Sequence, residues 1–181
     1  ERVSNASEVL ARSSSEQKNE ALVCAADALM AASSEILHSN SVDVIRAEES
    51  GTSATVIDRL RLDESRVEAM AGGLRQLLEL SDPIGRVLEC WSRPNGLEIR
   101  KVSVPLGVVA IIYENRPNVT SDAFGLCLKS GNAAFLRGSS GAIDSNIAIA
   151  GALRKGLAAA GLPEDAAVLV TDVSHEAAVE F

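Results

Sequence analysis

Polar side chains that could bind an anion gather where an apolar run ends, in the stretch GVVAIIYENRPNVTSD at residues 107–122. Four of them offer a carboxylate, a guanidinium and two amides: Glu114, Asn115, Arg116 and Asn118. A guanidinium here could meet a carboxylate or a phosphate. The alternative is a turn built around Pro117, in which the amides satisfy the turn's own backbone. The residues alone leave both interpretations open.

A second polar turn follows the next apolar run, in LRGSSG at residues 136–141. Arg137 supplies a charge, Gly138 would let the backbone approach a ligand, and Ser139 and Ser140 offer hydroxyls beside a helix start. This pattern indicates a nucleotide or phosphate contact. The alternative is that a serine caps the helix while Arg137 is a solvated surface charge.

The other residue types that carry chemistry point to structure. No G-x-G-x-x-G or G-x-x-x-x-G-K-[ST] motif is present, and His38 and His175 lack spaced metal ligands, so surface or helix-end positions are expected for both. Cys127 shares helical core spacing with Phe124 and Leu128, where a thiol behaves as a small hydrophobe. We therefore expect no metal site and a structural role for Cys127.

Composition excludes several classes of function. The 181 residues are 46% apolar with a formal charge of −8, which predicts a folded protein without a nucleic-acid groove or an affinity for anionic membranes. The three cysteines are widely spaced, without a C-x-x-C pair, which favours a reducing cytoplasm over a disulfide framework or a zinc site. Neither a signal-peptide pattern nor a membrane-spanning run is apparent.

The elements that would position the two turns can be read from hydrophobic spacing. Residues 1 to about 90 indicate helices. One begins at a capping box of Ser14 and Gln17 and keeps one stripe to Leu37, a shorter one follows Asn40 and stops near Gly51, and a third covers about 63–80. Strand-like alternation follows at residues 97–104, with a bulge or twist near Lys101.

Three apolar runs then alternate with helical segments. The runs at 107–113, 133–136 and 166–170 predict parallel strands buried on both faces. Helices are expected at about 119–130 and 141–160, ending at Gly131 and Gly161. The order β-α-β-α-β gives an α/β fold, half of a doubly wound sheet, in which ligands bind at the carboxyl ends of the strands.

At this point a family resemblance emerges. Residues 104–146, VPLGVVAIIYENRPNVTSDAFGLCLKSGNAAFLRGSSGAIDSN, closely resemble the gamma-glutamyl phosphate reductase family of the aldehyde dehydrogenase superfamily. The combination of YE-x-RPNVT, LCLKSGNA and LRG is specific to this family. SSSEQKNEALVCAADAL, DRLRLDESRVEAMAGGLRQLLELSDPIGRV and GLEIRKVSVPLG also resemble its N-terminal half.

The resemblance implies an activity. It is the NADPH-dependent reduction of L-glutamyl 5-phosphate to glutamate 5-semialdehyde with release of phosphate, the second step of proline biosynthesis, through a cysteine thioacyl intermediate. The family's nucleophile lies in a catalytic domain expected beyond Phe181, so this chain alone is expected to be inactive. The resemblance also implies a homo-oligomer, with glutamate 5-kinase as a further candidate partner.

The resemblance divides the chain into three regions of an aldehyde dehydrogenase-like fold. Residues 1–93 would be the N-terminal helical part of the cofactor domain, 94–105 a bridging strand, and 106–181 the βαβαβ portion of a Rossmann-like NADP-binding domain. The alternatives are a noncatalytic cofactor-binding or assembly fragment, and a different aldehyde dehydrogenase.

The resemblance also suggests roles for single residues. Arg137 falls where the superfamily places a basic side chain on the adenosine ribose, so it would hold the 2′-phosphate of NADP(H). Ser139 and Ser140 occupy the adjoining turn, and the strand end next to the cofactor carries Ile111, Ile112 and Tyr113.

The resemblance leaves the first turn open. Asn115 or Asn118 would contact the oxyanion or the substrate, and Arg116 a carboxylate or phosphate. The family usually has a small residue at position 115, and many relatives have Glu where this chain has Gly141.

Overall fold

The computed structural model describes residues 1–174 and 176. Its first half is helical, with five α-helices and one 3₁₀ turn among these residues: α1 (Arg2–Leu10), α2 (Ser15–Ala31), α3 (Ser33–Glu49), α4 (Ala54–Leu60), α5 (Glu64–Gln76) and η1 (Leu77–Glu79). The remainder alternates strands with helices and 3₁₀ turns: β1 (Val87–Ser92), β2 (Glu98–Val102), β3 (Val108–Ile112), α6 (Asn118–Lys129), β4 (Ala133–Arg137), η2 (Ser140–Ala142), α7 (Ile143–Ala159), η3 (Glu164–Ala166) and β5 (Ala167–Leu169).

The first long helix starts where the sequence predicts and ends earlier. The Ser14 side chain accepts a hydrogen bond from the backbone N–H of Gln17, which confirms the N-cap. The stripe to Leu37 nevertheless belongs to two helices, because Ala32 leaves helical geometry and α3 turns away from α2 by 64°. Two serines follow Ala32, and serine competes for backbone hydrogen bonds near helix ends.

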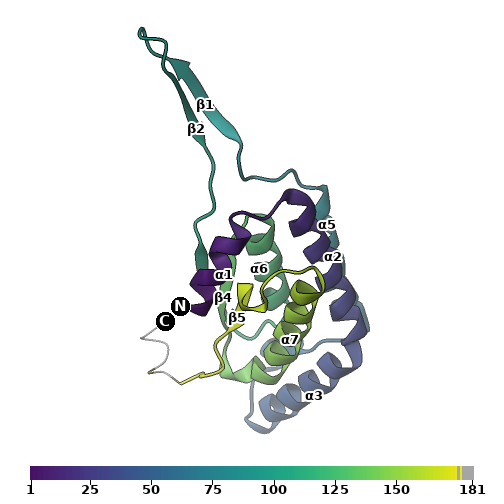
Figure 1. Ribbon diagram of the computed structural model, residues 1–181. Coiled ribbons are helices and arrows are strands. Elements are labelled where there is room, and N and C mark those ends of the chain that lie inside the picture. The colour runs from purple at the N-terminus through teal and green to yellow at the C-terminus, as the bar shows by residue number, and fades with distance from the viewer. Residues whose placement is uncertain (175, 177–181) are drawn as a thin grey trace.

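The predicted alternating strand is one arm of a hairpin. β2 pairs antiparallel with β1, which the expectation of helix up to about residue 90 misses. The turn between them carries Asn95 and Gly96, and Gly96 has a φ of 83°, which favours glycine. The hairpin projects from the helical body (Figure 1). Its register shifts between Val87 and Glu89, opposite the predicted irregularity near Lys101.

Three parallel strands form the sheet that carries the polar turns. Their order is β3-β4-β5, which confirms the predicted β-α-β-α-β arrangement. Burial of β3 on both faces is wrong for the described residues: Val109 and Ile111 pack toward α6, but Val108 is 37% and Ile112 61% exposed. β3 is an edge strand, and its second face is mostly uncovered here.

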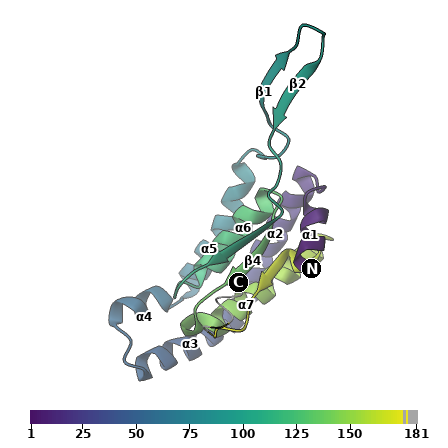
Figure 2. The same cartoon turned by 90° about the vertical axis from the view of Figure 1, so that its left-hand side faces the viewer.

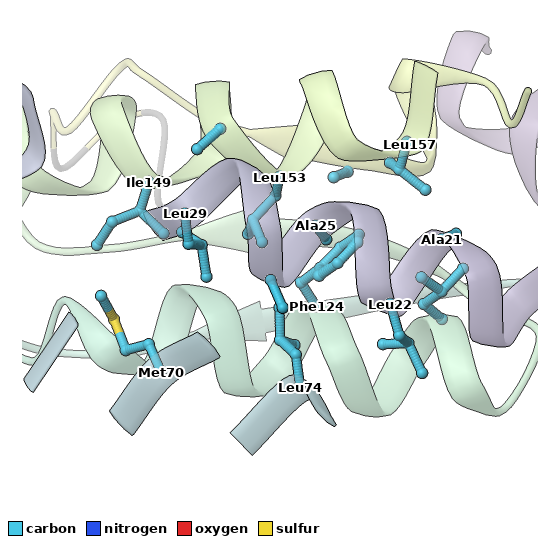
Figure 3. Close-up of a cluster of buried hydrophobic side chains, with 14 of the residues drawn as sticks. Ala21, Leu22, Ala25, Leu29, Met70, Leu74, Phe124, Ile149, Leu153 and Leu157 are labelled. Carbon is cyan, nitrogen blue, oxygen red and sulfur yellow. The ribbon is translucent and has the colours of Figure 1, made fainter. Parts of the chain in front are cut away.

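The main core lies among α2, α5, α6 and α7 (Figure 3). α2 contributes Leu22 and Leu29, which meet Phe124 of α6 and Leu153 of α7. α7 approaches α2 so closely at Gly156 that a Cβ there would lie 2.4 Å from the Cα atom of Ala25. This packing holds the helices that begin at the polar turns against the N-terminal half of the chain.

In the described part of the chain, no single helix combines the length and apolar character needed to cross a membrane. The bent pair of α2 and α3 meets those two criteria only when both helices are taken together.

Candidate cofactor and substrate site

The two polar turns lie side by side. β3 and β4 run parallel with Ile112 opposite Arg137, so both turns emerge at the carboxyl edge of the sheet. The backbone N–H of Tyr113 donates to the Arg137 carbonyl at 3.0 Å, which extends the pairing by one residue into the first turn. Residues 24 positions apart in sequence therefore form one surface.

Asn115 joins the first turn directly to the second. The hydroxyl of Ser139 donates to the Oδ1 atom of Asn115. That bond leaves the Asn115 Nδ2 atom with no partner among the described residues. The half-buried amide group is thus held by its oxygen and keeps its two N–H donors available.

Gly141 is required by this arrangement. A Cβ at position 141 would lie 2.6 Å from the Oδ1 atom of Asn115, closer than atoms in van der Waals contact come. The amide at position 115 and the glycine at position 141 therefore lie in close contact. Glu at 141 would collide with Asn115 in its present position.

A buried polar network lies behind the turns. The hydroxyl of Tyr113 and that of Thr120 are 2.7 Å apart, and Thr120 donates to the Oδ1 atom of Asn146 at 3.0 Å. Gly138 is packed against this network, since a Cβ there would be 2.2 Å from the Nδ2 atom of Asn146. Protein atoms therefore occupy the space on the Cβ side of Gly138, and its role as a point of ligand approach stays a prediction. Burial raises the pKa of Tyr113, and its hydrogen bond with Thr120 opposes this shift.

Arg137 is half-buried at the end of β4, and its Nη2 atom donates to the carbonyl of Ser174 at 2.7 Å. Its Nε atom is fully buried without a hydrogen-bond partner in the described structure. Hydrogen bonds from Ser174 hold the pKa of Asp172 below its usual range, and the charge of Arg137 lowers it further. The guanidinium is fixed at the rim and retains donor capacity, unlike a solvated surface charge.

The expected serine cap on the second crossover helix is wrong. Neither η2 nor α7 has a side-chain cap from its own preceding residue. Instead Asp43 of α3, which is fully buried, accepts the backbone N–H of Ser145 at 2.8 Å and its hydroxyl at 2.6 Å. Burial raises the pKa of Asp43, while these bonds from Ser145 oppose the shift.

Sequence reasoning missed Asp43 because it lies about 100 residues from the helix that it caps.

The Ser140 side chain is exposed. A cavity of about 360 Å³ lies beside it, between the end of α3, α4 and the two turns. Asn115, Ser139, Ser140 and Gly141 line that cavity together with Asp43 and Arg46.

The rest of the first turn faces outward. Glu114 and Arg116 are exposed, and the Arg116 side chain has no partner in the described part of the chain. Asn118 begins α6 and donates through Nδ2 to the Oδ2 atom of Asp122 at 3.0 Å. Asn118 also lines a second cavity of about 370 Å³, between α6 and the helices α4 and α5. The turn around Pro117 is therefore not closed by its own amides.

The remaining candidates keep the structural roles expected of them. Cys127 is buried between α6 and the sheet, and burial raises the pKa of its thiol to about 11. A thiol with that pKa is protonated at neutral pH and is a poor nucleophile. His38 is exposed on α3, and His175 lies outside the described residues. Within the described residues, no cluster of His, Cys, Asp and Glu could hold a metal ion.

Comparison with known proteins gives these features a context. No protein-family profile matches the chain. A gamma-glutamyl phosphate reductase from Clostridium beijerinckii is 50% identical over 177 residues, which cover 98% of this chain and 43% of that protein. The chain thus spans about two-fifths of the length of this curated relative and matches its N-terminal part.

Solved structures agree with the sequence match. The crystal structure of a gamma-glutamyl phosphate reductase from Thermotoga maritima superposes with a TM-score of 0.97 at 38% identity, covering 99% of this chain and 43% of that one. A probable aldehyde dehydrogenase from Listeria monocytogenes superposes with a TM-score of 0.72 at 18% identity, covering 97% and 36%. The latter likeness shows the fold alone: the chain has an aldehyde dehydrogenase-like fold.

Proposed function

We propose that this chain, which matches the N-terminal part of gamma-glutamyl phosphate reductases, supplies part of the cofactor and substrate site of such an enzyme. The reaction is the reduction of L-glutamyl 5-phosphate to L-glutamate 5-semialdehyde with release of phosphate, a step of proline biosynthesis. The observation that carries the proposal is 50% identity to a named reductase over 98% of the chain. The contact between the two polar turns supports it.

A nicotinamide dinucleotide fits the turn after β4. The buried Nε atom of Arg137 lacks a partner in the described structure. Ser139 and Ser140, in the turn that follows Arg137, line the cavity at the end of α3. We assign Arg137 to the 2′-phosphate of NADP(H), since a planar guanidinium binds phosphate in a bidentate manner. Ile112 offers an exposed apolar surface, while Ile111 and Tyr113 support the strand end from the α6 side.

When bound, the cofactor supplies the hydride that reduces the acyl group. The protein's own contribution in this chain is electrostatic. The Nδ2 atom of Asn115 has two N–H donors unused among the described residues, because Ser139 binds the Oδ1 atom. These donors would stabilise negative charge on the acyl oxygen of the substrate. Arg116, exposed and without a partner among the described residues, would meet the phosphate of the substrate.

The nucleophile in this proposal is a cysteine beyond Phe181. Its thiolate would attack the acyl carbon and phosphate would leave. Cys127 does not serve, because its thiol is buried and protonated at neutral pH. The chain by itself is accordingly expected to be inactive.

The reverse reaction tests the proposal in a full-length protein that contains this chain. Glutamate 5-semialdehyde should reduce NADP⁺ only when inorganic phosphate is present. Formation of glutamate without phosphate would instead assign a different aldehyde dehydrogenase.

Calorimetric titration of this chain alone with NADPH should show weak binding or none, because the site is partial. Tight binding without activity in the full-length protein would favour a noncatalytic binding module.

The hairpin β1–β2 supports the proposal of a homo-oligomer. It projects from the body with every residue of β1 exposed, Leu88 and Trp91 among them. A second subunit could cover these side chains. Light scattering on the full-length protein would measure its oligomeric state, and a pull-down would test glutamate 5-kinase as a further partner.

A further inference from the structure

A charged cavity beside the first polar turn has no role in the scheme above. It has a volume of about 370 Å³ and lies between α4, α5 and the N-terminal turn of α6. Figure 2 shows α4 at the end of the molecule away from the hairpin, next to α3. Its lining combines two arginines, an amide and a carboxylate with apolar side chains: Arg59, Arg66, Asn118, Asp122, Leu62 and Met70.

The two arginines in this cavity differ in what they contact. Arg66 donates to the carbonyls of Asp58 and Arg61, both at 2.6 Å, and so fixes the end of α4 against α5. Arg59 lies between those two anchor points and forms no hydrogen bond or ion pair within the described residues. Arg66 is therefore a positioning residue, and Arg59 is the cation available to a ligand.

The same cavity is also lined by a carboxylate without an ion-pair partner among the described residues. Asp122 of α6 accepts a hydrogen bond from Asn118 and faces α5, where its Oδ1 atom lies 3.8 Å from the Cβ position of Gly73. None of the described cations is within ion-pair distance of Asp122. Removal of solvent by the surrounding protein raises the pKa of Asp122, opposed by the Asn118 bond. An ammonium partner would offset that cost.

A cation and a carboxylate that line one cavity match a zwitterion. A second phosphate would meet repulsion from Asp122, and a simple amine would meet repulsion from Arg59. An α-amino acid end carries both charges on one carbon, with the carboxylate for Arg59 and the ammonium for Asp122. Asn118 connects this cavity to the turn that holds Asn115, three residues earlier, where the proposed acyl group reacts.

We propose that the cavity between α4, α5 and α6 binds the α-amino and α-carboxylate groups of the glutamyl substrate, through Asp122 and Arg59 respectively. This inference rests on the proposed function and adds the residues that select an amino-acid substrate. It makes the chain responsible for substrate specificity as well as for cofactor binding.

Truncated substrates test the assignment in the full-length enzyme. The phosphate-dependent oxidation of glutamate 5-semialdehyde is compared with that of 5-oxopentanoate, which lacks the amino group, and of 4-aminobutanal, which lacks the carboxylate. Arg59→Met should lower kcat/KM for glutamate 5-semialdehyde and 5-oxopentanoate by roughly 10- to 100-fold, and for 4-aminobutanal by less than about 3-fold. Asp122→Asn should lower kcat/KM for glutamate 5-semialdehyde and for 4-aminobutanal, and should leave kcat/KM for 5-oxopentanoate unchanged, because only 5-oxopentanoate lacks the amino group.

The controls separate recognition from folding. Arg59→Lys should recover part of the loss, because it restores charge without the planar fork. Arg12→Met removes an exposed arginine that lines a different cavity and should leave all three substrates unchanged.

The possible failures are distinguishable. Equal losses on all three substrates, or no loss, would overturn the subsite while phosphate-dependent activity of the unaltered enzyme persists. Absence of that activity would remove the proposed function and the subsite with it.

Discussion

At the scale of single residues, the candidate site depends on a few close contacts between side chains distant in sequence. Asn115 occupies the space that a side chain at position 141 would need, and Ser139 holds its carbonyl oxygen. The pair of an amide at 115 and glycine at 141 is thus one structural feature. Each of the two residues is explained only by its contact with the other.

This contact predicts coupled substitutions. Gly141→Ala should lower the free energy of unfolding by about 1–3 kcal/mol, because the new Cβ would meet the Asn115 Oδ1 atom at 2.6 Å. In an Asn115→Ala background the same change should cost less than about 0.5 kcal/mol. Urea unfolding of the four proteins measures the coupling. Strict additivity would mean that the two positions do not touch.

At the scale of elements, the helices are held by close approach and by one buried ion pair. α7 crosses α2 where Gly156 leaves no room for a Cβ, whereas nothing lies within 4 Å of the Cβ position of Gly151 on the same helix. The segment before the hairpin is fastened to α2 by Asp82, whose carboxylate is 2.6 Å from the Nζ atom of buried Lys18. These two features define where the helical half meets the sheet half and the hairpin.

The two glycines of α7 should respond in opposite directions to alanine. Gly156→Ala should destabilise the protein by about 2–3 kcal/mol, because backbone atoms of α2 must move. Gly151→Ala should stabilise it by about 0.5–1 kcal/mol through helix propensity. Thermal unfolding of both variants makes the comparison. A similar midpoint for the two would contradict the close crossing of α2 and α7.

The Asp82 contact predicts a pH dependence. Burial would raise the pKa of Asp82, but hydrogen bonds from Lys18, Ser15 and the N–H of Ile84 hold it below the usual value. Its stabilising contribution is therefore present above the ordinary carboxyl pKa of about 4 and is lost as pH falls through the lower folded value.

Asp82→Asn tests this sign. The variant should cost about 3 kcal/mol at pH 7, since it leaves Lys18 buried without its partner, and the difference from the unaltered protein should shrink below about pH 4. Lys18→Met, which removes the buried charge itself, should cost less. Urea unfolding between pH 3 and 7 measures both, and a pH-independent difference would argue against the ion pair.

The same elements show what the sequence could and could not predict. The Ser14 cap and the three parallel strands could be predicted from the sequence, because a capping box and an apolar run each involve residues that are close in sequence. The break at Ala32 was missed, since the apolar stripe continues across it. β1 was missed because all of its residues are exposed and carry no burial pattern.

At the scale of the whole molecule, an N-terminal helical half and a three-stranded parallel sheet hold two polar turns at one edge. The adjacency of those turns followed from the parallel topology, and the motifs within them carried the family resemblance. The cap by Asp43 and the cavity around Arg59 could not be predicted, because each joins segments whose proximity exists only after folding.

We proposed above that Arg137, at the carboxyl end of β4, selects a dinucleotide with a 2′-phosphate. The test is the Michaelis constant of a full-length protein containing this chain for NADPH and for NADH, with and without Arg137→Met. We expect the substitution to raise the Michaelis constant for NADPH by roughly 10- to 100-fold and that for NADH by less than about 3-fold. Equal changes for the two cofactors would contradict the proposal.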